Sequence, residues 1–317
     1  MIYENLIFSI GKVLPVFLVI FAGALLKKLG VIDRKFASDS TKLVFKFALP
    51  CLIFQEISSS DFIGLFDPLL IGISYAGTLA VFGLSWLISL FITSRPETRG
   101  AFIQGSYRSN FAIIGFPIIF NIFGQEGMPA AIILLTFAMP LFNILAVIAL
   151  TLNKTGENRN VRAADTLKEI AKNPLIISVL VSLPFSFLRI EIPGIINNTL
   201  DYFVKLTLPL ALCAIGATLE IRKIRESSTA AFSASSIKLI VSPGLVISAA
   251  LLLDIDNIDA GVLFILFGAP AAISSFVMAE AMGSDSGAAA NIVMTTTLLS
   301  IITISAGITI LKTIAII

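Results

Sequence analysis

Three residue types that lipid-facing helices rarely carry occur together in one apolar stretch of this chain. The stretch from Gly105 to Gly124 contains Arg108, Asn110 and Pro117 among aliphatic and aromatic side chains. A proline in a helix interior removes a backbone hydrogen bond, and in hydrocarbon the freed carbonyl must find another partner. Because broken helices at membrane depth usually form binding sites, we expect this helix to break at Pro117 and to hold a substrate there.

A second apolar stretch has a similar arrangement. The range 258–282 contains Pro270 among small residues, followed by Ser274 and Ser275. If both helices break at their prolines and cross near the membrane centre, two helix N-termini with unpaired N–H groups meet there. Together these two ends favour a negatively charged ligand.

The residues expected to contact this anion lie around the two prolines. Asn110 comes two helical turns before Pro117, so its amide points along the face on which the break opens. The alternative is that small and hydroxyl residues only allow close helix packing. The predicted contacts are Asn110, Gly115, Phe116, Pro117, Asn121, Gly268, Ala269, Pro270, Ser274 and Ser275.

Two charged residues flank the predicted breaks at similar depth. At 1.5 Å per residue, Arg108 lies about 13 Å from Pro117 and Glu280 about 15 Å from Pro270, both toward the cytoplasm. Charges at that depth are costly unless partnered or hydrated, so we predict a salt bridge between them that braces the crossing. The rival interpretation is that Arg108 snorkels toward the cytoplasm or meets the transported anion.

Other polar residues in apolar ranges are secondary candidates. Lys46 and Lys205 each precede a proline by four residues. They are interpreted either as symmetric structural residues or as groups that attract substrate into the vestibules. A further set either faces the same cavity or joins helices to one another, and consists of Asn143, Asn291, Thr295, Thr296 and Ser300.

The composition indicates a membrane protein. Of the 317 residues, 57% are hydrophobic and 13% are charged, whereas an ordinary soluble domain carries about 25% charge. The apolar runs of about twenty residues are long enough to cross the bilayer as helices and too long for barrel strands. We therefore expect an all-α integral membrane protein of the cell membrane, in contact with lipid.

The residues that are missing or rare exclude several functions. The chain has no histidine, which removes the usual metal ligand and histidine-based catalytic triads, so any proton chemistry must use carboxylates. Cys51 and Cys213 lie inside apolar runs and are interpreted as small buried hydrophobes. No basic face interleaved with aromatic residues indicates nucleic acid binding. We expect no enzymatic activity, no metal and no cofactor.

Ten helical spans are predicted in two halves. The polar connection at 153–173 is interpreted as a cytoplasmic linker between a first five-helix repeat at 1–152 and a second at 174–317. The N-terminus has an acid and no basic segment, so the first run is expected to be retained as a span. The spans are 5–26, 37–57, 69–93, 101–124, 128–152, 174–190, 196–219, 233–253, 258–282 and 287–311.

Matching residues indicate an internal repeat. Pairs 159 residues apart are Pro15 with Pro174, Lys46 with Lys205, and the Leu-Pro pair at 49–50 with that at 208–209. The two break prolines, at 117 and 270, are 153 residues apart. Because each repeat has an odd number of spans, the second enters the membrane from the opposite side.

Charge in the connections sets the expected orientation. Fourteen lysine and arginine residues follow the first, third, fifth and seventh spans, whereas the opposite connections are mainly acidic. By the positive-inside rule, the basic connections are cytoplasmic and both termini lie outside the cytoplasm.

The pattern R-x-N-x-x-x-x-G-x-P at residues 108–117, the second break at Pro270 and the two Leu-Pro pairs resemble the auxin efflux carrier family. That family includes the plant PIN-FORMED proteins and bacterial permeases linked to malonate and malate. The resemblance implies a dimerising scaffold of spans 1, 2, 6 and 7 and a transport domain of spans 3–5 and 8–10 that moves as an elevator. It also implies that Asn110 contacts substrate, and that Pro117 and Pro270 are the crossover prolines.

The expected function is therefore secondary transport of small organic anions, such as carboxylates or auxin-like weak acids, by alternating access and in the direction of efflux. An alternative in the same class is a sodium- or proton-coupled organic-anion importer of the bile-acid symporter type. Alternatives from another class are a membrane ligand sensor and a channel. The linker is short here, whereas plant carriers have a long phosphorylated loop, so regulation of that kind is not expected.

Overall fold

The computed structural model describes residues 2–59, 67–153, 172, 174–218, 229–314 and 316. Within this part, the regular structure is helical apart from one isolated β-bridge between Ser109 and Ala271. The side chains of Glu56 and Glu280 lie outside the described residues although their backbones are helical. The predicted linker, apart from residues 153 and 172, is outside them as well.

The first half is a series of long helices with short irregular turns between some of them. Labels with η mark π-helical or 3-10 turns. The elements are α1 (Ile2–Lys28), α2 (Arg34–Leu43), η1 (Val44–Ala48), α3 (Leu49–Ser58), α5 (Pro68–Ile92), α6 (Pro96–Tyr107), η2 (Phe111–Gly115), α7 (Phe116–Phe123), η3 (Gly124–Gly127) and α8 (Met128–Leu152).

The second half contains helices of comparable length. They are α10 (Pro174–Phe187), α11 (Gly194–Thr218), α12 (Thr229–Ser236), η5 (Ile237–Val241), α13 (Ser242–Leu252), α14 (Asn257–Gly268), α15 (Ile273–Ala281) and α16 (Ser286–Thr313). Six helical segments in the described part are long and apolar enough to cross a membrane, and two shorter apolar helices, at 177–187 and 257–268, accompany them. The ten spans and the inverted repeat stay predictions.

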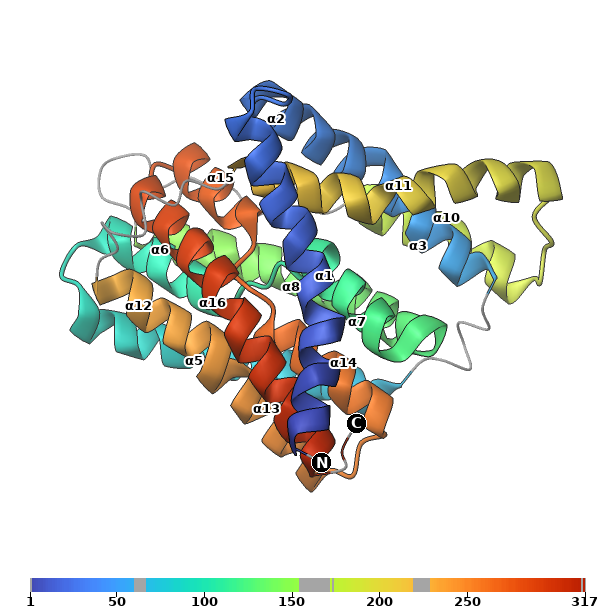
Figure 1. Cartoon of the computed structure of the whole chain (residues 1–317). Helices are drawn as coiled ribbons and strands as arrows, with labels where there is room; N and C mark the ends of the chain where they lie inside the picture. Colours follow the sequence, from blue (N-terminus) through green and yellow to red (C-terminus); the bar gives the residue numbers. More distant parts are fainter. Residues whose placement is uncertain are drawn as a thin grey trace.

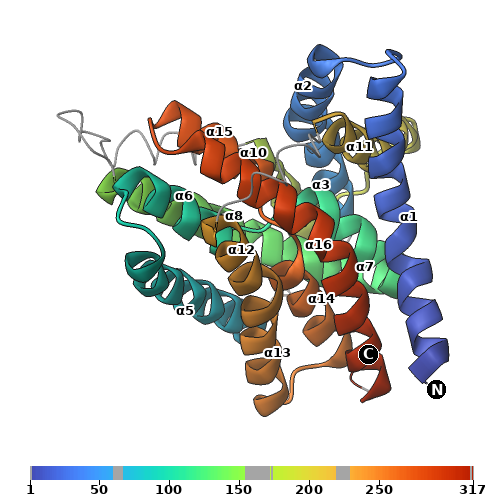
Figure 2. The same cartoon turned by 60° about the vertical axis from the view of Figure 1, so that its left-hand side comes forward.

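The helices form two groups (Figures 1 and 2). Helices α2, α3, α10 and α11 pack together, with α1 along α11. Helices α5, α6, α8 and α12–α16 form the other group, and α1 also packs along α16. The two termini lie close together, because Asn5 donates to Thr313 at 3.1 Å and Thr309 donates to Ser9 at 2.9 Å.

The contact between α1 and α11 depends on small residues. A Cβ added at Gly216 would meet the carbonyl oxygen of Ile20, and one added at Gly23 would meet the carbonyl oxygen of Cys213. Glycines on both helices therefore let the two backbones approach directly, which is how helices associate where no water drives them together.

Three prolines follow π-helical turns instead of breaking their helices. Pro50, Pro117 and Pro243 each come two residues after a π turn, namely η1, η2 and η5. A proline has no N–H, and its ring clashes with the carbonyl four residues earlier. The extra residue in a π turn shifts that carbonyl, so the helix continues through the proline.

The expected break at Pro117 is therefore wrong in its position. Pro117 lies in the first turn of α7, which follows η2 without interruption, and both are helical from 111 to 123. The interruption of this segment falls at 108–110 instead, between the end of α6 at Tyr107 and the start of η2. In the second segment, Pro270 does lie at the interruption, between α14 and α15.

Two acidic residues of the predicted outer connections have a local role at helix starts. The Asp67 carboxylate accepts from the N–H groups of Leu69 and Leu70 at 2.7 and 3.1 Å, and Asp256 accepts from Ile258 at 3.0 Å. A carboxylate at this position satisfies N–H groups that have no partner within the helix and interacts favourably with the helix dipole. These residues therefore fix where α5 and α14 begin.

Candidate substrate-binding site

The two interruptions are short non-helical segments with different local causes. Ala269 has φ −63° and ψ 148°, as expected for the residue before a proline, whose ring disfavours the helical region. Arg108 is also extended, with φ −73° and ψ 122°, although no proline follows it. Its conformation is accounted for by the second interruption, against which it lies.

The two extended segments pair through their main chains. The Asn110 N–H donates to the carbonyl of Pro270 at 2.8 Å, and the Ala272 N–H donates to the carbonyl of Arg108 at 3.2 Å. The Ala271 N–H donates to the hydroxyl of Thr296 on α16 at 3.1 Å. Each interruption thus supplies partners for polar groups that the other has released from its helix, as an apolar environment requires.

Three polar side-chain atoms at these interruptions are buried without a partner among the described groups. They are the amide nitrogen of Asn110 and the hydroxyl oxygens of Ser109 and Ser275. Their side chains are almost inaccessible, with Asn110 only 6% exposed. Buried polar groups in proteins are nearly always hydrogen-bonded, so three orphans at one place mark a position where a polar ligand would be stabilised.

The guanidinium of Arg108 is held by neutral groups. It donates to Asn143 at 2.7 Å and to the sulfur of Met278 on α15 at 2.6 Å. The side-chain amide of Gln104 is oriented so that both of its polar atoms have partners. Its oxygen then accepts from the Arg108 guanidinium at 3.2 Å, and its nitrogen donates to the carbonyl of Ser275 at 3.2 Å. The predicted pair of Arg108 with Glu280 stays a prediction, because the Glu280 side chain lies outside the described residues.

The residues around Pro117 pack against one another. A Cβ added at Gly115 would come within 2.6 Å of the Phe111 ring, so this position has room only for glycine while the ring stays in place. The rings of Phe111 and Phe116 meet edge to face at 5.4 Å. Pro117 is buried as well. This part of the predicted site shapes the helix next to the interruption.

Other predicted residues lie elsewhere. Asn121 donates to the carbonyl of Lys12 on α1 at 3.0 Å and so ties α7 to α1. Ser274 is exposed, whereas Ser275 is buried. Asn291 is half-buried and Thr295 is buried, both on α16. Lys46 is exposed. Lys205 is exposed too and lies 3.5 Å from Asp201.

A cavity of about 640 Å³ lies between the two helix groups. Its wall on one side comes from α3 and α11, and on the other from α7, η3 and the start of α8. Gln55 donates to Asn197 at 2.9 Å and to Asp201 at 2.7 Å. This interhelical cavity is lined by Leu52, Gln55, Ser59, Phe120, Gln125, Met128, Asp201, Val204, Lys205, Leu208 and Pro209.

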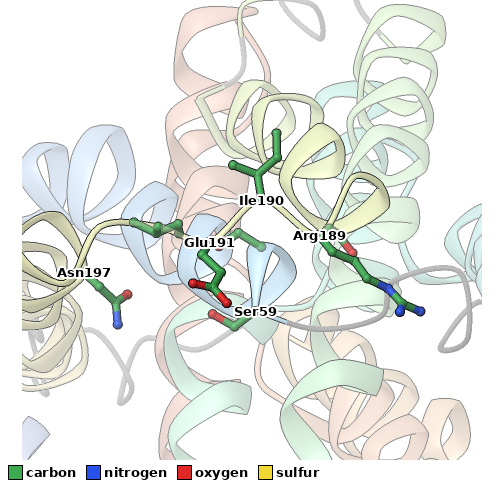
Figure 3. Close-up of a pocket in the computed structure, with 8 residues that line it drawn as sticks. Ser59, Arg189, Ile190, Glu191 and Asn197 are labelled. Carbon is green, nitrogen blue, oxygen red and sulfur yellow. The ribbon is translucent and has the colours of Figure 1, made fainter.

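A second cavity, of about 560 Å³, lies near the ends of α3 and α10 and the start of α11. Figure 3 shows the carboxylate of Glu191 directed toward Ser59 while the guanidinium of Arg189 points away. Arg189 has φ 50°, a left-handed conformation that is uncommon outside glycine. Apart from the secondary candidate Lys205, none of the predicted site residues lines either of these two cavities.

Sequence reasoning missed a lysine and a polar pair. Lys238 in η5 is fully buried and donates to the carbonyl of Phe267 at 2.7 Å. The feature of the sequence that could have indicated it is a single lysine inside the apolar range 229–252. Gln55 and Asp201, which bond across α3 and α11, carried a similar signal as isolated polar residues in apolar helices.

Comparison with known proteins gives matches along most of the chain. A protein of Methanothermobacter thermautotrophicus described as "Uncharacterized transporter" is 26% identical over 302 residues, covering 93% of this chain and 96% of that protein. A Rhizobium meliloti protein described as "Putative malonate transporter" is 27% identical over 300 residues, covering 93% of both. The mouse lysosomal cholesterol signaling protein is 24% identical over 262 residues, which cover 74% of this chain and 29% of that protein.

The family comparison agrees with these matches and with the resemblance drawn from the sequence. Residues 8–308, nearly the whole chain, match the family described as "Membrane transport protein". Both interrupted segments, from α6 to α7 and from α14 to α15, lie within this match. The chain is therefore a member of the membrane transport protein family, which includes the auxin efflux-like carriers.

Proposed function

We propose that the protein is a secondary transporter that carries small organic anions, such as carboxylates or auxin-like weak acids, across the cell membrane. The observation that carries this proposal is the pairing of two interrupted helices around the unpartnered amide of Asn110. Membership of a membrane transport family supports the transport function. The similar protein described as a malonate transporter supports a carboxylate as the substrate class.

The chemistry at the interruptions suits a carboxylate. The segment from η2 to α7 and the helix α15 both begin there, and a helix N-terminus offers N–H donors and roughly half a positive charge. The Asn110 amide nitrogen and the hydroxyls of Ser109 and Ser275 add donors that have no described partner. Arg108 would contribute positive charge next to the interruptions while its neutral partners hold it in place.

The arrangement of helices supports alternating access by an elevator movement. Both interruptions belong to the group of α5, α6, α8 and α12–α16, together with α7, so they would move as one transport domain. Helices α1, α2, α3, α10 and α11 would form the scaffold, which is also the proposed dimer interface. The interhelical cavity lies between these two groups and would give the anion access from one side.

Export is the direction that membrane energetics favour. An anion that leaves a cell with a negative interior gains about 2.3 kcal/mol per charge per 100 mV. Export therefore needs no coupling ion, whereas import against this potential needs sodium or protons. Dependence of transport on either ion would favour the importer alternative over the exporter.

The test is counterflow of radiolabelled carboxylates in proteoliposomes, with sodium and pH varied. We expect saturable exchange for at least one small carboxylate, and at least about tenfold loss of affinity in Asn110→Ala, because a donor in a low-dielectric site is lost. Asn198→Ala, an exposed asparagine on α11, is the matched control and should behave as wild type.

Other outcomes would overturn this proposal. Saturable binding without exchange would identify a sensor, and ion flux at rates above those of any alternating carrier would identify a channel. Unchanged carboxylate affinity in Asn110→Ala would exclude this residue from the site.

A further inference from the structure

Lys238 is a buried lysine whose side chain reaches the C-terminal end of α14. In the described part of the chain, two residues with ionisable charged side chains are buried, namely Lys238 and Arg108. The ammonium of Lys238 is 2.7 Å from the carbonyl oxygen of Phe267. No described carboxylate lies within salt-bridge distance of it. An unpaired buried charge is costly in hydrocarbon, and such residues in transporters are usually functional.

The acceptor of this hydrogen bond belongs to the last turn of α14. That helix ends at Gly268 because Ala269 and Pro270 interrupt it. The last carbonyls of a helix have no partner within it, and the helix dipole makes this end partially negative. The interruption thus creates a partially negative helix end inside the protein, and Lys238 supplies the cation that this end favours.

In transporters built from broken helices, the C-terminal ends of half-helices and unwound carbonyls coordinate the coupling cation. Here a lysine ammonium lies at such an end. We infer that Lys238 is a built-in cation that takes the place of a bound sodium ion. This inference rests on the proposed function and deepens it, because it follows that anion transport by this protein does not depend on sodium.

Oxygen ligands near Lys238 would remain if its side chain were removed. Besides the carbonyl of Phe267, the hydroxyl of Ser242 lies one helical turn after Lys238 and is buried without a described partner. Ser74 and Thr78 on α5, a helix that packs against α13, also have buried hydroxyls without a described partner. Helix α5 packs against this region, because a Cβ added at Gly77 would come within 3.1 Å of the Phe267 ring. Truncation of Lys238 should therefore leave a small polar cavity suited to a monovalent cation.

The first test measures thermal unfolding of the purified full-length protein in detergent, in choline, sodium or methylammonium chloride at equal ionic strength. Wild type should unfold at the same temperature in all three. Lys238→Ala should unfold about 5 °C lower in choline and recover in sodium or methylammonium, because a hydrogen bond to a charged group is lost and then replaced. Lys238→Met, whose apolar chain fills the space, should not recover.

The matched control is Lys42→Ala, which removes an exposed lysine of α2 and should leave unfolding unchanged in every salt. Selective stabilisation of wild type by sodium, or a Lys238→Ala variant whose response to the three salts equals that of wild type, would overturn the inference. This arm needs no substrate, so it can fail or succeed independently of the proposed function.

The second test distinguishes the effect of the positive charge of Lys238 from the effect of its hydrogen bond to Phe267. Lys238→Gln keeps a donor for the carbonyl of Phe267 but removes the positive charge. We expect this variant to fold and to bind carboxylates about tenfold more weakly, with sodium restoring affinity only in Lys238→Ala. Wild-type affinity in Lys238→Gln would show that the lysine is only structural. If wild type itself binds no carboxylate, the proposed function fails, while the unfolding measurements still decide whether Lys238 acts as a cation.

Discussion

At the residue scale, Arg108 combines a fixed position with a positive charge that no described carboxylate neutralises. Arg108 is 4% exposed as a residue, and its guanidinium bonds to Asn143, Met278 and Gln104. A guanidinium presents several donors in a rigid plane, so three neutral partners can orient it without cancelling its charge. Under the proposed function, this charge would remain available to the transported anion.

Substitution of Asn143 tests this division between position and charge. Asn143→Ala leaves an Arg108 donor unpaired and should cost about 1–3 kcal/mol of stability. Asn143→Asp should restore the thermal stability by forming an ion pair, yet weaken carboxylate affinity about tenfold because the added negative charge opposes the ligand. Thermal unfolding and equilibrium binding of the labelled carboxylate measure the two effects.

A different result would change the role of Arg108. If Asn143→Asp binds the carboxylate as tightly as wild type, the charge of Arg108 does not act on the ligand, and the residue only braces the helices. Asn198→Asp, which adds the same charge at an exposed position of α11, controls for a general effect of negative charge.

At the element scale, the second interruption, at 269–272, depends on a third helix. Thr296 on α16 accepts from the Ala271 N–H at 3.1 Å and donates to the carbonyl of Ile292 in its own helix at 2.7 Å. It therefore connects the extended segment 269–272 to the side of a continuous helix. The interruption is thus held by hydrogen bonds from both α16 and the segment 108–110.

Replacement of Thr296 by valine removes the hydroxyl while keeping the shape of the side chain. We expect Thr296→Val to destabilise the protein by about 1–3 kcal/mol, because the Ala271 N–H is left buried without a partner. Thr297→Val is the matched control, since its hydroxyl bonds only to the carbonyl of Val293 in its own helix. Thermal unfolding measures the loss of stability in both variants, and we expect a larger loss in Thr296→Val. Equal losses would show that Thr296 has no special role at the interruption.

At the scale of the whole molecule, the interhelical cavity lies between parts of the two helix groups, which are joined elsewhere by the packing of α1 along α16. Phe120 lines it from α7, whereas Leu52 and Leu208 line it from α3 and α11. Close glycine contacts fasten α1 to α11, whereas this cavity divides α3 and α11 from α7. A relative movement of the groups would therefore change the cavity most.

Cross-linking across the cavity tests the proposed elevator. In a variant with Cys51 and Cys213 replaced by serine, Phe120→Cys with Leu208→Cys joined by a bifunctional thiol reagent should stop counterflow, because the groups can no longer move apart. Leu52→Cys with Leu208→Cys joins two helices of one group and should leave counterflow intact. Full counterflow after complete cross-linking of the first pair would exclude the elevator.

Some features followed from the sequence because their causes are local or compositional. Apolar runs of about twenty residues predicted membrane helices, and six described segments meet that criterion. Pro270 predicted the second interruption because a proline restricts the residue before it and removes its own N–H. The motif at 108–117 predicted the family, and the match over residues 8–308 confirms it.

The tertiary structure alone decided where the first interruption falls. Pro117 has the same local chemistry as Pro270, yet a π turn carries the helix through it. The chain is instead non-helical at 108–110, where Pro270 and Ala272 form main-chain hydrogen bonds with Asn110 and Arg108. Lys238 was likewise missed because its acceptor lies 29 residues away in the sequence. A main-chain group that loses its helical hydrogen bond in an apolar environment needs another partner. The sequence can indicate which residue loses that bond, whereas only the packing of the helices determines which group becomes the new partner.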